Sequence, residues 1–256
     1  MIGAIIGDIV GSKYEFNNIR TKDFPLFSSG CGYTDDTICT IAVADALLTG
    51  TPFAERLQHW CRKYPHPKGA YGGSFARWIF MEDPKPYGSY GNGSAMRVSP
   101  CGYLETAERV GEAARLSAEC THNHPEGIKG AVSVAEVIFR LRHGASKDEI
   151  RAYVTEQFGY NLSQTVDSIR RTNRFDETCQ VTVPQSFVCF LESTGFEDAI
   201  RNAISIGGDS DTIGAITGSL AEAFYGVPES LRKVAITYLP GEFVSVLDAF
   251  NLKFAL

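Results

Sequence analysis

The sequence has little positive charge and no long apolar run, and each shortage argues against a class of protein. With 24 Lys and Arg against 30 Asp and Glu, the net charge at pH 7 is −6, so a nucleic acid held by a globally basic surface is not expected. No stretch approaches the roughly 18 consecutive apolar residues that a membrane-spanning helix requires. The apolar start reaches Asp8 early and carries no basic residue, which is not typical of a secretory signal. We therefore expect a cytoplasmic protein that binds no membrane.

The cysteines are odd in number, scattered and without a C-x-x-C pair. They are Cys31, Cys39, Cys61, Cys101, Cys120, Cys179 and Cys189. This pattern is typical of reduced thiols, and it favours neither a disulfide framework nor a zinc site. His122 and His124 are close in sequence, but no cysteine is near them, so zinc is not expected there either.

The sequence also lacks the alternating pattern of β-strands, internal repeats and linker-like segments. Apolar residues recur instead at helical spacing. The expected helices are 2–12, 38–48, 53–63, 73–81, 94–103 (interrupted by Pro100), 105–120, 126–143, 150–158, 165–170, 183–192, 196–206, 213–225, 229–238 and 243–251. The segments 16–34 and 171–182 are expected to be loops. The sequence therefore predicts an all-α fold in which residues 1–256 form a single domain.

The first expected helix carries a glycine at every fourth position. Gly3, Gly7 and Gly11 would form one smooth face of that helix. Because glycine costs roughly 1 kcal/mol relative to alanine inside a helix, tight packing is expected to offset that cost. We therefore expect another backbone to approach this face closely.

Two short acidic motifs carry the same chemistry near opposite ends of the chain. Residues 33–37 read Tyr-Thr-Asp-Asp-Thr, and residues 207–212 read Gly-Gly-Asp-Ser-Asp-Thr. Each precedes a helical run, so helix capping is one interpretation. The other is that both motifs face one cavity and hold a hard cation, Mg²⁺, Mn²⁺ or Ca²⁺, because such ions prefer oxygen ligands. Four carboxylates brought together would repel one another strongly without one or two ions.

A glycine-rich loop, residues 91–97, reads Gly-Asn-Gly-Ser-Ala-Met-Arg and leads into another helical run. Its backbone N–H groups could bind a phosphate. It has neither the lysine of a P-loop nor the strand context of a dinucleotide-binding fold, and a plain tight turn capped by Ser94 is the alternative. Tyr71-Gly72-Gly73 is a weaker candidate of the same kind. Glu15 is a lone carboxylate that by itself predicts no function.

Taken in order, these motifs resemble the ADP-ribosylglycohydrolase family, which includes the dinitrogenase-reductase-activating glycohydrolases. The resemblance runs from Gly3 to about Gly226. It depends on Gly7-Asp8, Gly11-Ser12-Lys13-Tyr14-Glu15, residues 33–37, residues 91–97, Thr121-His122 and residues 208–212. It implies a compact all-α fold of several helices, with a dinuclear Mg²⁺ centre, or a Mn²⁺ centre, in a central cleft.

The resemblance also implies roles for individual residues. The metal ligands would be Thr34, Asp35, Asp36, Asp209, Asp211 and Thr212. The ADP-ribose group would contact Tyr71, Gly72, Asn92, Gly93, Ser94, Ala95, Met96 and His122. Glu15 matches the acidic residue at the scissile glycosidic bond, and the sequence does not decide whether Glu15 or Asp36 handles the proton. Lys13, if it pointed into the cleft, would lower the pKa of Glu15.

The implied function is metal-dependent hydrolysis of the bond between ADP-ribose and a modified protein side chain or small molecule. One alternative is a di-metal phosphoesterase, because paired metal ions serve phosphate hydrolysis equally well. Another is a non-catalytic relative that only binds ADP-ribose or has a structural role. The acceptor stays open among arginine, serine, O-acetyl-ADP-ribose and modified nucleic acid. It would contact the rim loops 16–34 and 171–182.

Overall fold

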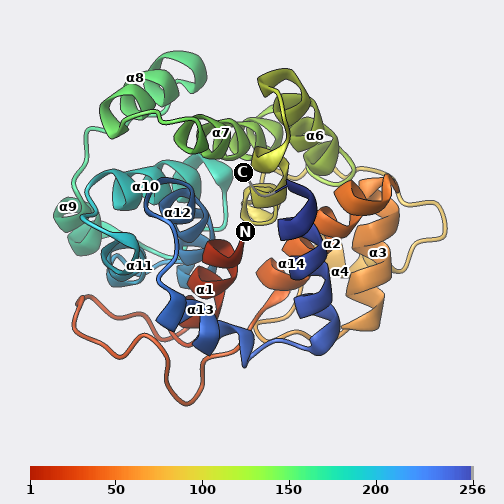
Figure 1. The fold of residues 1–256 in the computed structure, drawn as a ribbon, viewed down its shortest axis with the longest axis horizontal. Coiled ribbons are helices and arrows are strands. Elements are labelled where there is room, and N and C mark those ends of the chain that lie inside the picture. The colour runs from red at the N-terminus through yellow and green to blue at the C-terminus, as the bar shows by residue number, and fades with distance from the viewer. Residues whose placement is uncertain (255–256) are drawn as a thin grey trace.

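The computed structural model describes residues 1–254 and confirms the all-α prediction, since these residues form helices and no sheet. Figure 1 shows α1 at the centre of the molecule with the other helices around it. The helices are α1 (Ile2–Gly11), α2 (Asp35–Thr49), α3 (Phe53–Lys63), α4 (Gly73–Ile79), α5 (Gly93–Met96), α6 (Ala107–Glu119), α7 (Pro125–Arg142), α8 (Lys147–Phe158), α9 (Val166–Thr172), α10 (Cys179–Leu191), α11 (Phe196–Ser205), α12 (Ser210–Tyr225), α13 (Glu229–Ile236) and α14 (Gly241–Phe254), with a 3₁₀ turn at Ser99–Tyr103. The predicted domain extends to residue 256, and its last two residues lie outside the described part. No helix of the described chain combines the length and the apolar character that crossing a bilayer requires.

The centre of the fold is the antiparallel pair formed by α1 and α12. A Cβ atom added at Gly7 would lie 1.9 Å from the carbonyl oxygen of Gly214, and one added at Gly218 would lie 2.1 Å from that of Gly3. The two backbones are therefore in direct contact, which only glycine permits. This confirms the close approach that the glycine spacing predicts. It also places the residues after α1 beside the start of α12.

Asp8 fixes the start of α2 against α1. This fully buried carboxylate accepts hydrogen bonds from the backbone N–H of Thr34 (3.0 Å) and Thr37 (3.1 Å) and from both hydroxyl groups. The orphan N–H groups at the start of α2 are thus satisfied by a residue of the central helix. As a result α1 holds the starts of both α2 and α12, where the two acidic motifs lie.

Several predicted helix boundaries are wrong by a few residues, among them the starts of α8 and α12 and both ends of α14, and the predicted helix 94–103 is instead α5 followed by the 3₁₀ turn. Two of the differences have a clear physical reason. Helix α2 begins at Asp35 and not at residue 38, because Thr34 caps it by accepting a hydrogen bond from the Asp36 N–H at 3.2 Å. The segment 171–182 is not one loop, because α9 and α10 take both of its ends and leave only 173–178 without helix. The first turn of α10 contains polar side chains, so the pattern of apolar residues did not indicate a helix there. Pro184, which lies inside α10, also argued against a helix that begins well before it.

Candidate active site

The starts of α2 and α12 open into one cavity of about 470 Å³. Twelve of the site residues expected from the sequence line it: Glu15, Asp35, Asp36, Tyr71, Gly72, Asn92, Gly93, Met96, His122, Asp209, Asp211 and Thr212. The two acidic motifs, about 170 residues apart in the chain, therefore contribute to the same cavity.

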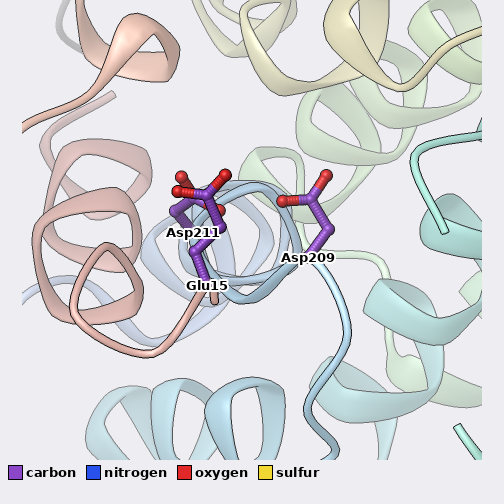
Figure 2. A group of neighbouring side chains, drawn as sticks. All are labelled: Glu15, Asp209 and Asp211. Carbon is purple, nitrogen blue, oxygen red and sulfur yellow. The ribbon is translucent and has the colours of Figure 1, made fainter. Parts of the chain in front are cut away.

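Three carboxylates form the most compact part of this cavity. One oxygen atom from each of Glu15, Asp209 and Asp211 lies within 4.8 Å of the other two. Figure 2 shows the three carboxylates directed to the same side, with Glu15 next to Asp211. Asp36 joins them from α2, because Thr212 donates a hydrogen bond from its Oγ1 to Asp36 Oδ2 at 3.3 Å. Carboxylate oxygens from α2 and α12 thus meet beside Glu15.

Burial and mutual repulsion disfavour the charged form of these groups. Burial raises the pKa of Asp209 to about 6. Burial, and after it the nearby Asp211, raises the pKa of Glu15 to about 8. Burial and then Asp211 raise the pKa values of Asp35 and Asp36 well above their usual range. Burial and then Asp209 do the same to the pKa of Asp211. Without a metal ion, Glu15, Asp35, Asp36 and Asp211 therefore favour the protonated form near neutral pH.

The acidic cluster also contains buried oxygen atoms without a hydrogen-bond partner. They are Glu15 Oε2, Asp36 Oδ1 and Asp211 Oδ1, considered within residues 1–254. A buried polar atom left unsatisfied costs about 1–3 kcal/mol. A divalent cation among these oxygens would satisfy them and offset the repulsion, so the donor set fits a hard metal ion.

Asn18, a residue that the sequence did not single out, positions the loop before Asp209. Its side chain accepts a hydrogen bond from the Gly208 N–H (2.8 Å) and donates to the carbonyl oxygens of Gly208 (2.9 Å) and Tyr14 (2.6 Å). Gly208 has φ +85°, and a Cβ there would lie 2.7 Å from the side chain of Asn173. Asn18 thus ties the residues after α1 to the loop that carries Asp209. A single asparagine in a loop has no sequence signature that could reveal this.

Lys13 does not point into the cavity. Its Nζ donates a hydrogen bond to Ser28 Oγ at 2.8 Å and lies 5.7 Å from the centre of the Tyr14 ring. The lowered pKa that Lys13 would have given Glu15 is therefore absent, and the pKa of Glu15 is raised instead.

A buried cation, Arg97, lines the same cavity. This side chain is only 1% exposed, and it donates to the carbonyl oxygen of Ser117 and to Thr121 Oγ1, both at 2.8 Å. Its Nε has no partner, and no carboxylate pairs with the guanidinium within residues 1–254. Arg97 and His122 both line the cavity. The cavity is therefore lined by groups of opposite sign. We call the part formed by Glu15, Asp35, Asp36, Asp209 and Asp211 the acidic end, and the part formed by Arg97, Thr121 and His122 the Arg97 end.

The glycine-rich loop contacts the acidic end through Asn92. The Asn92 side chain donates from Nδ2 to Asp209 Oδ2 at 2.6 Å. The side chains of three expected site residues do not line the cavity. Ser94 Oγ donates to the carbonyl oxygen of Gly127 at 2.7 Å, Ala95 is buried, and Thr34 Oγ1 donates to Asp8 Oδ1 at 2.8 Å.

Two exposed aromatic rings lie at the mouth of the cavity and were also missed by the sequence reasoning. Phe16 is 75% exposed and lines the cavity, and Phe175 is 44% exposed. Their ring centroids are 6.1 Å apart and the rings stack. Glu177 lines the cavity beside them. These residues come from the rim loops in which the sequence placed acceptor contacts.

Comparisons with known proteins match this chain along nearly its whole length. A family model described as ADP-ribosylglycohydrolase matches residues 1–244. The chain is 26% identical to ADP-ribosylhydrolase ARH3 of Homo sapiens in an alignment that is 315 positions long, gaps included. The alignment covers 91% of this chain and 87% of that protein. It is 25% identical to ADP-ribosylarginine hydrolase Tri1 of Pseudomonas putida over 278 residues, 92% of this chain and 73% of that protein. A solved structure described as an ADP-ribosylglycohydrolase-related protein complex shares the fold, with a TM-score of 0.68, 23% identity and coverage of 99% and 94%.

Proposed function

The chain belongs to the ADP-ribosylglycohydrolase family, and we propose that it is a metal-dependent hydrolase that releases ADP-ribose from a modified protein side chain or small molecule. The observation that supports this most strongly is the cavity itself, which is lined both by a cluster of carboxylates and by a buried guanidinium that no carboxylate pairs with in residues 1–254. A substrate with both a sugar and a diphosphate suits a site with these two ends.

The acidic end would hold one or two divalent ions, with Mg²⁺ the first choice and Mn²⁺ the second. Their ligands would come from both motifs, with Asp35 and Asp36 on α2 and Asp209, Asp211 and Thr212 at the start of α12. When bound, such ions supply a Lewis acid that polarises substrate oxygens. Thr34, whose hydroxyl bonds to Asp8, would support the start of α2 and could contribute its oxygen.

Glu15 is our choice for the group that handles the proton. It belongs to the acidic end and is next in sequence to Phe16, which also lines the cavity, and its Oε2 has no hydrogen-bond partner within residues 1–254. Without a metal ion the pKa of Glu15 is about 8, and a carboxyl group that can hold a proton beside the scissile bond can act as the general acid for the departing acceptor atom. Asp36 lies deeper, and its Oδ2 accepts a hydrogen bond from Thr212. Asp36 is therefore the second choice.

The Arg97 end would bind the diphosphate of ADP-ribose. A guanidinium suits phosphate oxygens, and the cavity has a volume typical of small-molecule sites. Gly91 and Gly93 leave room for a ligand in front of His122. The acceptor would then emerge between Phe16 and Glu177, where the cavity opens to solvent.

The test is a panel of substrates incubated with the protein and Mg²⁺: an ADP-ribosylated arginine peptide, an ADP-ribosylated serine peptide and O-acetyl-ADP-ribose. Released products are separated by chromatography. Release of intact ADP-ribose, lost in Glu15→Gln, would support the proposal. Cleavage of the diphosphate that survives Glu15→Gln would favour a phosphoesterase. Binding of ADP-ribose without turnover of any substrate would favour the non-catalytic alternative.

A further inference from the structure

We propose that Arg97 and Thr121 are positioning residues that fix the tautomer of His122, so that His122 presents its Nε2–H to the ligand. The position of the proton follows from the hydrogen bonds around Thr121 and from the burial of the ring beside Arg97. Only the identity of the ligand, the ADP-ribose group, rests on the proposed function.

The first step is the direction of the hydrogen bonds around Thr121. A guanidinium has only donors, so Arg97 donates to Thr121 Oγ1 at 2.8 Å. The hydroxyl proton of Thr121 has two acceptors to choose from, His122 Nδ1 at 2.7 Å and the Ala118 carbonyl oxygen at 3.5 Å. The shorter bond has the better geometry. Thr121 therefore donates to Nδ1, which must be unprotonated to accept.

The second step is the charge of the imidazole. His122 is 5% exposed and lies close to the Arg97 guanidinium. Burial, and after it the charge of Arg97, lowers the pKa of His122 well below its usual value. The ring is therefore neutral near pH 7 and carries one proton. Because Nδ1 accepts from Thr121, that proton is on Nε2.

The third step is the direction of Nε2. A Cβ atom added at Gly93 would lie 3.1 Å from Nε2, and one added at Gly91 would lie 3.7 Å from it. Both glycines and His122 line the cavity. Nε2 has no hydrogen-bond partner in the described chain, where the only bond of the His122 ring is at Nδ1. The N–H is thus directed at the space that the glycines leave open, where it can donate to a phosphate or hydroxyl oxygen.

The hydrogen-bonded series Arg97–Thr121–His122, which we call the relay, determines which ligands the Arg97 end favours. A neutral Nε2–H in the cavity accepts no hydrogen bond, so it favours ligands that present lone pairs, such as diphosphate or ribose oxygens. Without the Thr121 hydroxyl, nothing in the described contacts would keep the proton on Nε2. The expected loss in affinity is that of one hydrogen bond from a neutral donor, roughly threefold to tenfold.

The test uses Thr121→Val, which removes the hydroxyl at nearly constant shape, and Thr121→Ser, which restores it. In ligand-free protein labelled with ¹⁵N-histidine, long-range ¹H–¹⁵N correlations report which ring nitrogen of His122 is protonated, and His122→Gln assigns the signals. We expect an Nε2–H tautomer in wild type and Thr121→Ser, and a mixture in Thr121→Val. Calorimetric titration with ADP-ribose is expected to show threefold to tenfold weaker binding only in Thr121→Val.

A wild-type signal from Nδ1–H, or a Thr121→Val variant with the wild-type tautomer and affinity, would overturn the proposal. Melting temperatures of the three proteins separate these effects from lost folding. If wild type shows the Nε2–H tautomer but does not bind ADP-ribose, the relay stands and the proposed function fails. If it binds ADP-ribose through the other tautomer, only the relay fails.

Discussion

The acidic end and the Arg97 end of the cavity hold ionisable groups of opposite kind, carboxyl groups and a guanidinium, yet no ion pair within residues 1–254 joins them. The acidic end is assembled from distant parts of the chain, residue 15, the start of α2 and the start of α12. The Arg97 end is more local, since its hydrogen-bonded residues lie between Arg97 and His122. Buried charges without partners are costly to keep. Each end is therefore best explained as one half of a site whose other half is a ligand, a cation for one and an anion for the other.

The largest effect is expected from neutralising one carboxylate of the acidic end. Asp35→Asn should lower the rate of ADP-ribose release by about 100-fold or more, because it removes a proposed metal ligand. The metal-free variant should be at least as stable as wild type, because burial, and after it the charge of Asp211, disfavours the ionised form of Asp35 and raises its pKa. Rates with Mg²⁺ and melting temperatures without it check both parts.

The matched control for this change is Asp248→Asn, an exposed carboxylate on α14 away from the cavity. It should alter neither quantity. If Asp35→Asn turns over substrate at the wild-type rate, the acidic end is not the metal site.

The sequence predicts much of the acidic end and little of the Arg97 end. The acidic end could be predicted, because each of its two motifs places two carboxylates close together in the sequence at the start of a helix. The regular spacing of the α1 glycines separately predicts a close contact between helices. Arg97 could be quoted within a motif but given no role. Its meaning depends on burial and on the lack of a carboxylate partner, which are properties of the folded chain. The role of Asn18 could not be predicted for the same reason, since its hydrogen-bond partner Gly208 lies 190 residues away in the sequence.

A substitution in the central helix pair should affect the acidic end more than the Arg97 end. In Gly7→Ala the new methyl group would clash with the Gly214 backbone. Unlike a side chain, the backbone cannot relieve the clash by changing rotamer. We expect a loss of about 3 kcal/mol in the free energy of unfolding, measured by urea denaturation. Activity should fall further than ADP-ribose binding, because α1 and α12 position the acidic end and not Arg97.

Gly241→Ala is the control for this variant, since nothing lies within 4 Å of a Cβ added there. Its stability should stay within about 1 kcal/mol of wild type. Wild-type stability in Gly7→Ala would mean that the two helices can separate without cost.

Next in size is the effect of pH on the metal-free protein. The folded-state pKa of Asp209 is about 6 and that of Glu15 about 8, both above the ordinary value of about 4. Groups with raised pKa values stabilise the fold while protonated, so this contribution is complete below about pH 4 and lost as the pH rises through 6 and 8. We expect the melting temperature without metal to fall across this range.

Mg²⁺ should reverse that fall, because it binds the deprotonated carboxylates. At about 100 times its dissociation constant it would add about 2.7 kcal/mol. The stabilisation should be large at pH 8 and small at pH 5, as thermal unfolding with and without Mg²⁺ would show. Equal stabilisation at both pH values would contradict a site made of these carboxylates.

The smallest effect is expected at the mouth, which belongs to neither end. Phe16 is 75% exposed and stacks on Phe175, so Phe16→Ala would remove the proposed contacts with the acceptor without changing the carboxylates or Arg97. We expect kcat/KM for an ADP-ribosylated peptide to fall about fivefold, or about 1 kcal/mol, while the affinity for free ADP-ribose stays unchanged. Phe80→Ala, which truncates another exposed ring (61%) beyond the end of α4, should change neither. Equal losses for the peptide and for free ADP-ribose would place Phe16 on the ADP-ribose side of the cavity, and the mouth would then be part of one of the two ends.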